Sequence, residues 1–87
     1  MYLQVNDFAN TIKVFKSSDL EYLQINCQIC ISNNFQVQII NNSGQIIYNN
    51  TINNQDFKIP LSSIGSGLYL IVIRQNNKIV YTSKLLN

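Results

Sequence analysis

The chain contains no histidine and no tryptophan, and only four of its 87 residues are acidic. Without histidine, a serine- or cysteine-based catalytic triad lacks its usual general base. The acidic residues form no Asp-rich calcium loop, and no pair of carboxylates marks a cleft for glycoside hydrolysis. A zinc site is short of ligands too, because the chain has only two cysteines. We therefore expect no enzyme activity, no metal and no cofactor.

Charge is also scarce. Charged residues make up 11% of the chain, against roughly 25% in average proteins, and the net charge is +2. The basic residues are dispersed, which argues against nucleic acid or an anionic membrane as partner, since both are bound by clustered Lys and Arg. No apolar run is long enough for a membrane span. The first residues lack a basic start and an apolar middle, so we expect any secretory signal to lie upstream of residue 1.

Eighty-seven residues suffice for one small domain, and helical periodicity is missing over any useful length. Short segments with alternating or continuous apolar residues are instead separated by Asn, Ser and Gly. The clearest alternation runs over 35–39, and a turn at 41–44 with Gly44 follows it. We predict an all-β fold, an immunoglobulin-like antiparallel Greek-key β-sandwich of about seven strands. Residues 1–10 are expected to be a linker or weakly ordered segment, and 11–87 the single sandwich domain.

The last third of the chain predicts a crossover followed by a hairpin. Tyr69 opens an apolar strand after the Gly65-Ser66-Gly67 segment, which suits a tyrosine whose hydroxyl bonds back to upstream backbone. Strands over 68–75 and 78–85 flank Asn76-Asn77, and Asn tolerates the left-handed backbone of a two-residue type I′ turn. This register pairs Leu68 with Leu85. The residues assigned to the core are Leu68, Leu70, Val72, Ile79, Tyr81 and Leu85. The opposite face is also apolar, so we expect it to be covered by loops or by a ligand, and it carries Tyr69, Ile71, Ile73 and Val80.

Cys27 and Cys30 form a Cys-x-x-Cys pair. A redox motif of this kind belongs at the start of a helix in a thioredoxin-like βαβ pattern, which this sequence lacks. Positions three apart on a strand point to opposite faces, so a disulfide would need a turn or bulge between them. We interpret the pair as two structural thiols, and a redox or disulfide role is the alternative.

Several motifs follow one another in a family-specific order. An apolar strand over 37–40 precedes a turn with Gly44-Gln45. Leu61-Ser62 and then Gly67-Leu68-Tyr69 lead into a second apolar strand, and the last strand has a lysine near its end. In this order and spacing, residues 35–87 resemble the C-terminal sorting domain (type A) of the type IX (Por) secretion system of Bacteroidetes. The family usually opens with Tyr-Pro-Asn-Pro, whereas this chain has Phe15 in the tyrosine place and neither proline.

The resemblance implies a secretion and sorting signal that directs a larger upstream cargo protein through an outer-membrane translocon to the cell surface. Translocon and sortase components would be its partners, and its location would be secreted or cell-surface. The candidate residues for recognition by the translocon are Lys78, Lys84, Leu85 and Leu86, and the positions that match the family and have a structural role are Gly44, Gly67 and Tyr69. A surface adhesive or carbohydrate-binding module and a plain spacer are the alternatives, and unpaired edge strands leave room for a homodimer.

Overall fold

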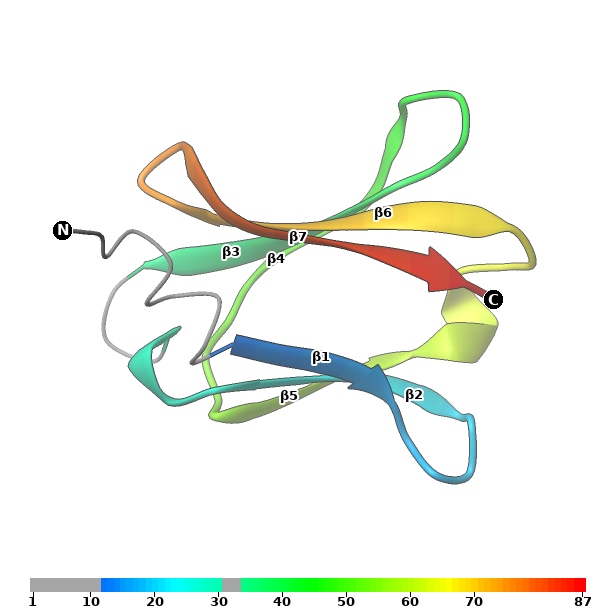
Figure 1. Ribbon diagram of the computed structural model, residues 1–87, viewed down its shortest axis with the longest axis horizontal. Coiled ribbons are helices and arrows are strands. Elements are labelled where there is room, and N and C mark those ends of the chain that lie inside the picture. The colour runs from blue at the N-terminus through cyan, green and yellow to red at the C-terminus, as the bar shows by residue number, and fades with distance from the viewer. Residues whose placement is uncertain (1–11, 31–33) are drawn as a thin grey trace, which may run out of the picture.

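A computed structural model describes residues 12–30 and 34–87, which form two antiparallel sheets stacked face to face (Figure 1). The three-stranded sheet contains, in order, β1 (Ile12–Lys16), β2 (Tyr22–Cys27) and β5 (Asp56–Pro60). The four-stranded sheet contains, in order, β4 (Ile46–Thr51), β3 (Phe35–Ile40), β6 (Leu68–Gln75) and β7 (Lys78–Leu86).

This arrangement confirms the predicted all-β sandwich of about seven strands. The chain changes sheets between β2 and β3, between β4 and β5, and between β5 and β6. One-turn 3₁₀ helices begin two of these crossings, η2 (Gln28–Cys30) after β2 and η3 (Leu61–Ser63) after β5. The immunoglobulin-like Greek-key assignment stays a prediction, and the linker predicted over 1–10 lies outside the described residues.

The core lies between the two sheets and is built mainly from side chains at alternating positions of the strands, which face inward. On β3, Phe35, Val37 and Ile39 are fully buried, as the alternation predicted. Complete burial of one such side chain stabilises the fold by about 1.5–3 kcal/mol, so a small domain depends on each of them. The buried core comprises Ile12, Leu23, Ile25, Cys27, Cys30, Phe35, Val37, Ile39, Ile52, Phe57, Ile59, Leu61, Tyr69, Ile71, Ile73 and Leu85.

The β6–β7 hairpin has the predicted strands and turn, but the predicted core face of β6 is wrong. Asn76 and Asn77 adopt φ values of 53° and 69°, as a type I′ turn requires. Val72 is buried as predicted, but Leu68 and Leu70 are exposed, and the other buried residues of β6 are the alternate set. That set is Tyr69, Ile71 and Ile73.

A bulge in β7 explains the error in register. Arg74 pairs with Ile79 and Ile73 with Tyr81, so Val80 is an extra residue that shifts every later pair by one position. Leu68 therefore pairs with Leu86 instead of Leu85. Ile79 precedes the bulge and keeps its predicted partner Arg74, but the face that the two share is the outer one, so Ile79, which we expected in the core, has half of its surface exposed.

The crossing into β6 is held by Tyr69, as its position predicted. Its hydroxyl oxygen lies 2.9 Å from the carbonyl oxygen of Ile64, 3.1 Å from that of Gly65 and 3.3 Å from that of Ser66. Gly67, at φ 142°, lets the backbone run past the ring, whose nearest carbons would lie 3.7 Å from a Cβ at this position. A single buried phenol thus fixes the whole turn that links the two sheets.

Tyr69→Phe is expected to lower the free energy of unfolding by roughly 1–3 kcal/mol, because it leaves carbonyl groups at the corner without their donor. Chemical denaturation of the two proteins measures the difference. Tyr48→Phe is the matched control, since Tyr48 also packs against the core, and within the described residues its hydroxyl accepts a single long hydrogen bond, from the Asn50 amide at 3.4 Å. Equal losses for the two variants would contradict the role assigned to the Tyr69 hydroxyl.

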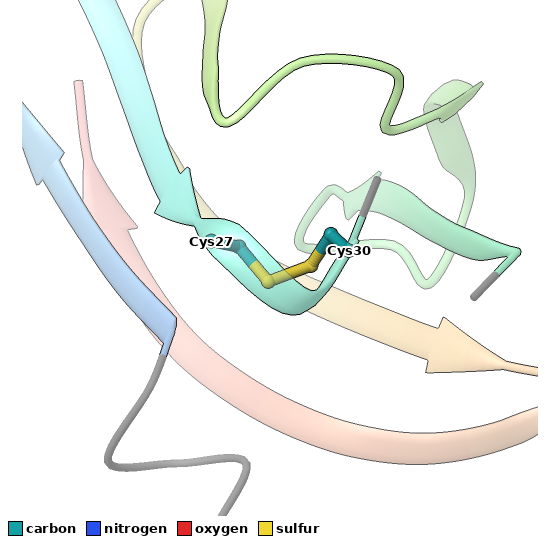
Figure 2. Close-up of a disulfide and its surroundings, with 2 residues drawn as sticks. All are labelled: Cys27 and Cys30. Carbon is teal, nitrogen blue, oxygen red and sulfur yellow. A yellow bond between two sulfur atoms is a disulfide. The ribbon is translucent and has the colours of Figure 1, made fainter. Parts of the chain in front are cut away.

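The two cysteines form a disulfide (Figure 2). Strand β2 ends at Cys27, and η2 then turns the chain so that the Cα atoms of Cys27 and Cys30 lie 5.4 Å apart. Our interpretation of two structural thiols is therefore wrong, because the turn removes the constraint that an extended strand would impose. Both residues are fully buried, so the bridge fastens the start of the β2–β3 crossing to the core.

Candidate recognition surface on the four-stranded sheet

The outer face of the four-stranded sheet carries a row of side chains that crosses all of its strands. Ile46 on β4 pairs with Ile40 on β3, Ile40 pairs with Leu70 on β6, and Leu70 pairs with Lys84 on β7. Directly opposed residues share a face, so these four side chains stand together. Leu68 and Leu86 form the next pair on the same face. We call this surface the outer patch: Ile40, Ile46, Leu68, Leu70, Lys84 and Leu86.

The outer patch is apolar and open to solvent. The exposed fraction is 54% for Ile46, 46% for Leu68, 38% for Leu70 and 70% for Leu86. Single exposed apolar residues are ordinary, but a contiguous group marks an interaction site on a soluble domain. Because the inner face of the same strands already fills the core, this second apolar face is not needed for folding.

The β3–β4 turn borders the patch and makes it concave. The turn rises from the sheet at the top of the view (Figure 1), and Gly44 adopts φ 84° at its end. The Asn41 side-chain oxygen accepts hydrogen bonds from the backbone N–H of Ser43 at 3.0 Å and of Gln45 at 2.9 Å. A hollow of about 170 Å³ lies between this turn and β6, and its lining includes Asn42, Leu68 and Lys84.

The end of β7 is fastened to the neighbouring elements. Asn87 exchanges two backbone hydrogen bonds with Gly67, and its side-chain amide donates to the carbonyl oxygens of Leu61 at 3.1 Å and Gly65 at 2.7 Å. The Lys16 ammonium of β1 donates to the carbonyl oxygen of Leu86. Residues of the patch on β7 are therefore held in a fixed position beside β6.

The β1–β2 loop is ordered by its own polar groups. The Ser17 hydroxyl donates to the Asp19 carboxylate, which also accepts the backbone N–H of Glu21 at 3.1 Å. The bond from Ser17, and then that from the Glu21 backbone, hold the pKa of Asp19 below its usual value. Leu20 at the tip of this loop has φ 60° and is 66% exposed, on the sheet opposite the outer patch.

The structure separates the four residues that the sequence suggested for recognition. Lys84 and Leu86 lie in the outer patch, whereas Lys78 begins β7 at the opposite end of the strand. Leu85 faces inward opposite Tyr69 and is 4% exposed, so it lies in the core and is left out of the surface. Of the family positions, Gly44 lies in the β3–β4 turn and Gly67 and Tyr69 in the crossing to β6.

Most of the outer patch was missed by the sequence analysis. The predicted register places Leu68 and Leu70 in the core, and Ile40 is predicted only as part of an apolar strand. The signal that distinguishes them is the pairing across four strands, which no local pattern contains. Among residues 12–30 and 34–87, no helix is long and apolar enough to cross a membrane, and no group of three or more His, Cys, Asp or Glu is placed to hold a metal ion.

Residues 19–86 match the family described as secretion system C-terminal sorting domain. The match runs from the turn before β2 to the last residue of β7, so it includes both sheets except β1. The chain belongs to the type IX sorting-domain family. No curated protein sequence matches the chain.

Membership of the type IX sorting-domain family confirms the resemblance drawn from the motifs at residues 35–87. The family consists of sorting signals and is not an enzyme family. A type IX sorting domain implies an upstream cargo protein, type IX secretion machinery that handles it, and secretion across the outer membrane to the cell surface or the extracellular space. The mainly β architecture agrees with this assignment.

Proposed function

We propose that this sorting domain carries an upstream cargo protein through the type IX outer-membrane translocon to the cell surface, and that the translocon binds its outer patch. The observation that carries the proposal is a largely apolar outer patch to which all four strands of one sheet contribute, on a domain of the sorting family. A sortase component is the second partner that the proposal requires, to release the cargo after transport.

Two features suit the outer patch to recognition. The patch lies on regular strands with fixed pairing, so its side chains are preorganised and lose little freedom on binding. It also requires correct folding, because its residues come from segments between Ile40 and Leu86 that meet only when the sheet has formed. A translocon that binds this patch therefore tests the folded state of the domain.

The tyrosines give little support to a carbohydrate-binding module. Tyr48 and Tyr81 pack against the core, and Tyr69 forms the corner. Of the tyrosines in the described residues, Tyr22 lies on an outer face, where the Lys58 ammonium is 5.6 Å from its ring centre. The described residues thus offer no row of aromatic rings on which a sugar could stack.

A fusion experiment tests the proposal. Residues 1–87 are appended to a periplasmic reporter that carries its own export signal, and surface reporter is measured by antibody labelling of intact cells. We expect surface delivery in a type IX-competent strain and none in a translocon-deficient strain. Leu70→Ala combined with Leu86→Ala should reduce the surface fraction about tenfold, corresponding to ~1.4 kcal/mol of lost binding.

The matched control for this pair is Ile79→Ala. Ile79 is 50% exposed on β7 but lies near the β6–β7 turn, outside the outer patch. This variant should be delivered as efficiently as the unchanged domain. Retention of the unchanged fusion in the periplasm of the competent strain would contradict the proposed function, and equal loss for Ile79→Ala would remove the outer patch from it.

A further inference from the structure

We propose that the partner of the outer patch is a protein surface with an apolar area and, beside it, a carboxylate that pairs with Lys84. The proposal rests on the proposed function, because it takes the patch to be bound during export. It adds the chemistry of the partner, and it makes Lys84 the residue that selects this partner.

The two sheets differ in their acidic residues. Strands β3, β4, β6 and β7 contain Arg74, Lys78 and Lys84 and no acidic residue. The acidic residues in the described part of the chain, Asp19, Glu21 and Asp56, all belong to the three-stranded sheet or its β1–β2 loop. The four-stranded sheet therefore presents charge of one sign, which favours an acidic partner and orients its approach.

Lys84 is the basic residue of this sheet that ends the apolar row, on the edge strand β7. Arg74 is already used by the fold, since its Nε donates to the Gln38 side-chain oxygen at 2.9 Å, and Lys78 lies at the far end of β7. The Lys84 ammonium makes no hydrogen bond or ion pair within the described residues. Its direct partner across the sheet is Leu70, and both line the hollow beside the β3–β4 turn.

A surface that covers the row as far as the edge strand β7 removes water from the Lys84 ammonium. An ammonium group that loses its water without a partner costs far more than the surrounding apolar contacts return, so the covering surface must supply an anionic group at this point. A carboxylate opposite Lys84 meets this need. The same arrangement excludes competing apolar surfaces, because they would leave the cation buried and unpaired.

Two other occupants fit the charge less well. A second copy of the domain stacked on this face would bring the basic residues of two four-stranded sheets together, and like charges across an interface are unfavourable. An anionic membrane surface is held by clusters of basic residues, whereas the outer patch contains the single cation Lys84. Both occupants are outcomes that the experiment distinguishes.

The test uses the reporter fused to the full 87-residue chain, with Lys84→Glu, Lys84→Met and the control Lys78→Glu. We expect Lys84→Glu to reduce surface delivery at least about thirtyfold, because two carboxylates then oppose each other. Lys84→Met keeps the apolar stem and leaves the partner carboxylate unpaired, so its loss should be intermediate. Lys78→Glu carries the same charge change outside the patch and should be delivered normally. Thermal melting confirms that each variant folds.

Suppressor selection then identifies the carboxylate. Starting from Lys84→Glu, mutations that restore surface delivery should include Asp or Glu to Lys or Arg changes in a translocon component. Normal delivery of Lys84→Glu, while the Leu70→Ala and Leu86→Ala pair remains defective, would overturn the partner chemistry and leave the proposed function intact. Failure of the unchanged fusion would instead defeat the proposed function itself.

Binding measurements separate the remaining occupants. Purified domain is mixed with phosphatidylglycerol vesicles, and its oligomeric state is measured alone. Vesicle binding that is lost in Lys84→Glu would overturn the proposal in favour of a lipid surface. A dimer that the same substitution strengthens or abolishes would overturn it in favour of a second copy. We expect a monomer that leaves the vesicles unbound.

Discussion

Ile71→Ala should lower the free energy of unfolding by about 2–5 kcal/mol, whereas Leu70→Ala should lower it by less than about 1 kcal/mol. The two residues are neighbours on β6 and point to opposite faces. Ile71 is fully buried between the sheets, and Leu70 is 38% exposed in the outer patch. Truncation of Ile71 leaves a cavity in the core, whereas truncation of Leu70 removes a side chain that water already contacts.

Thermal and urea denaturation followed by circular dichroism measure this difference. In a domain of this size 1 kcal/mol corresponds to roughly 4–8 °C in melting temperature, so Ile71→Ala should melt at least about 8 °C lower. Export should depend directly on Leu70, which lies in the outer patch, and on Ile71 only through the stability of the fold. Leu70→Ala should impair delivery although its melting temperature falls by less than about 8 °C. A larger loss of stability for Leu70 than for Ile71 would mean that the sheet presents its other face, and the outer patch would no longer exist.

Local sequence signals predicted those parts of the fold that local chemistry determines. Asn76-Asn77 forms the turn because asparagine accepts a left-handed backbone at both positions. The strand around Val37 shows its buried face in the sequence, because Gln36 and Gln38 occupy the other face. Tyr69 reaches carbonyl groups three to five residues upstream, so its corner is also a local structure.

The buried face of β6 could not be predicted in the same way. Leu68, Leu70 and Val72 on one side of the strand are as apolar as the residues on the other side. Alternation carries no information when both faces are apolar. Pairing with β7 would have distinguished the two faces of β6. The bulge at Val80 shifts the register of β7 by one residue, however, and a shift of one residue moves the later side chains of β7 to the opposite face.

The outer patch depends on contacts that lie far apart in the chain. Its row joins Ile46, Leu70 and Lys84 through pairs between β4 and β3, β3 and β6, and β6 and β7. Lys84 is one of the residues that the sequence suggests for recognition, and in the structure it lies opposite Leu70 on the outer face. Its apolar neighbours were assigned wrongly, because they are set by sheet order and register instead of by spacing along the chain.

Cys27 and Cys30 show the same limit at a shorter range. Their spacing was judged on an extended strand, where the two side chains point to opposite faces. The strand ends at Cys27, however, and η2 begins at Gln28. A boundary that falls between the two cysteines decides whether they meet, and strand boundaries are the least certain feature of a sequence pattern.

Replacing both cysteines by alanine should lower the free energy of unfolding by about 2 kcal/mol. Loss of a native disulfide from a small secreted domain costs about 2–5 kcal/mol, and the entropic gain is smallest for a short loop. The Cys27–Cys30 bridge spans a sequence separation of three, which places it at the low end. The corresponding fall in melting temperature is roughly 8–16 °C.

Reductant supplies the control for this substitution. Unfolding of the unchanged domain in dithiothreitol should give nearly the stability of the Cys27→Ala, Cys30→Ala variant, and the variant itself should not respond to reductant. If reductant lowered the stability of both proteins equally, the disulfide would not be the cause. Because both sulfurs are fully buried, reduction requires opening of the fold, so reductant should act slowly under native conditions and quickly in denaturant. Disulfides persist in oxidising compartments, so the domain should reach its full stability only after export from the cytoplasm.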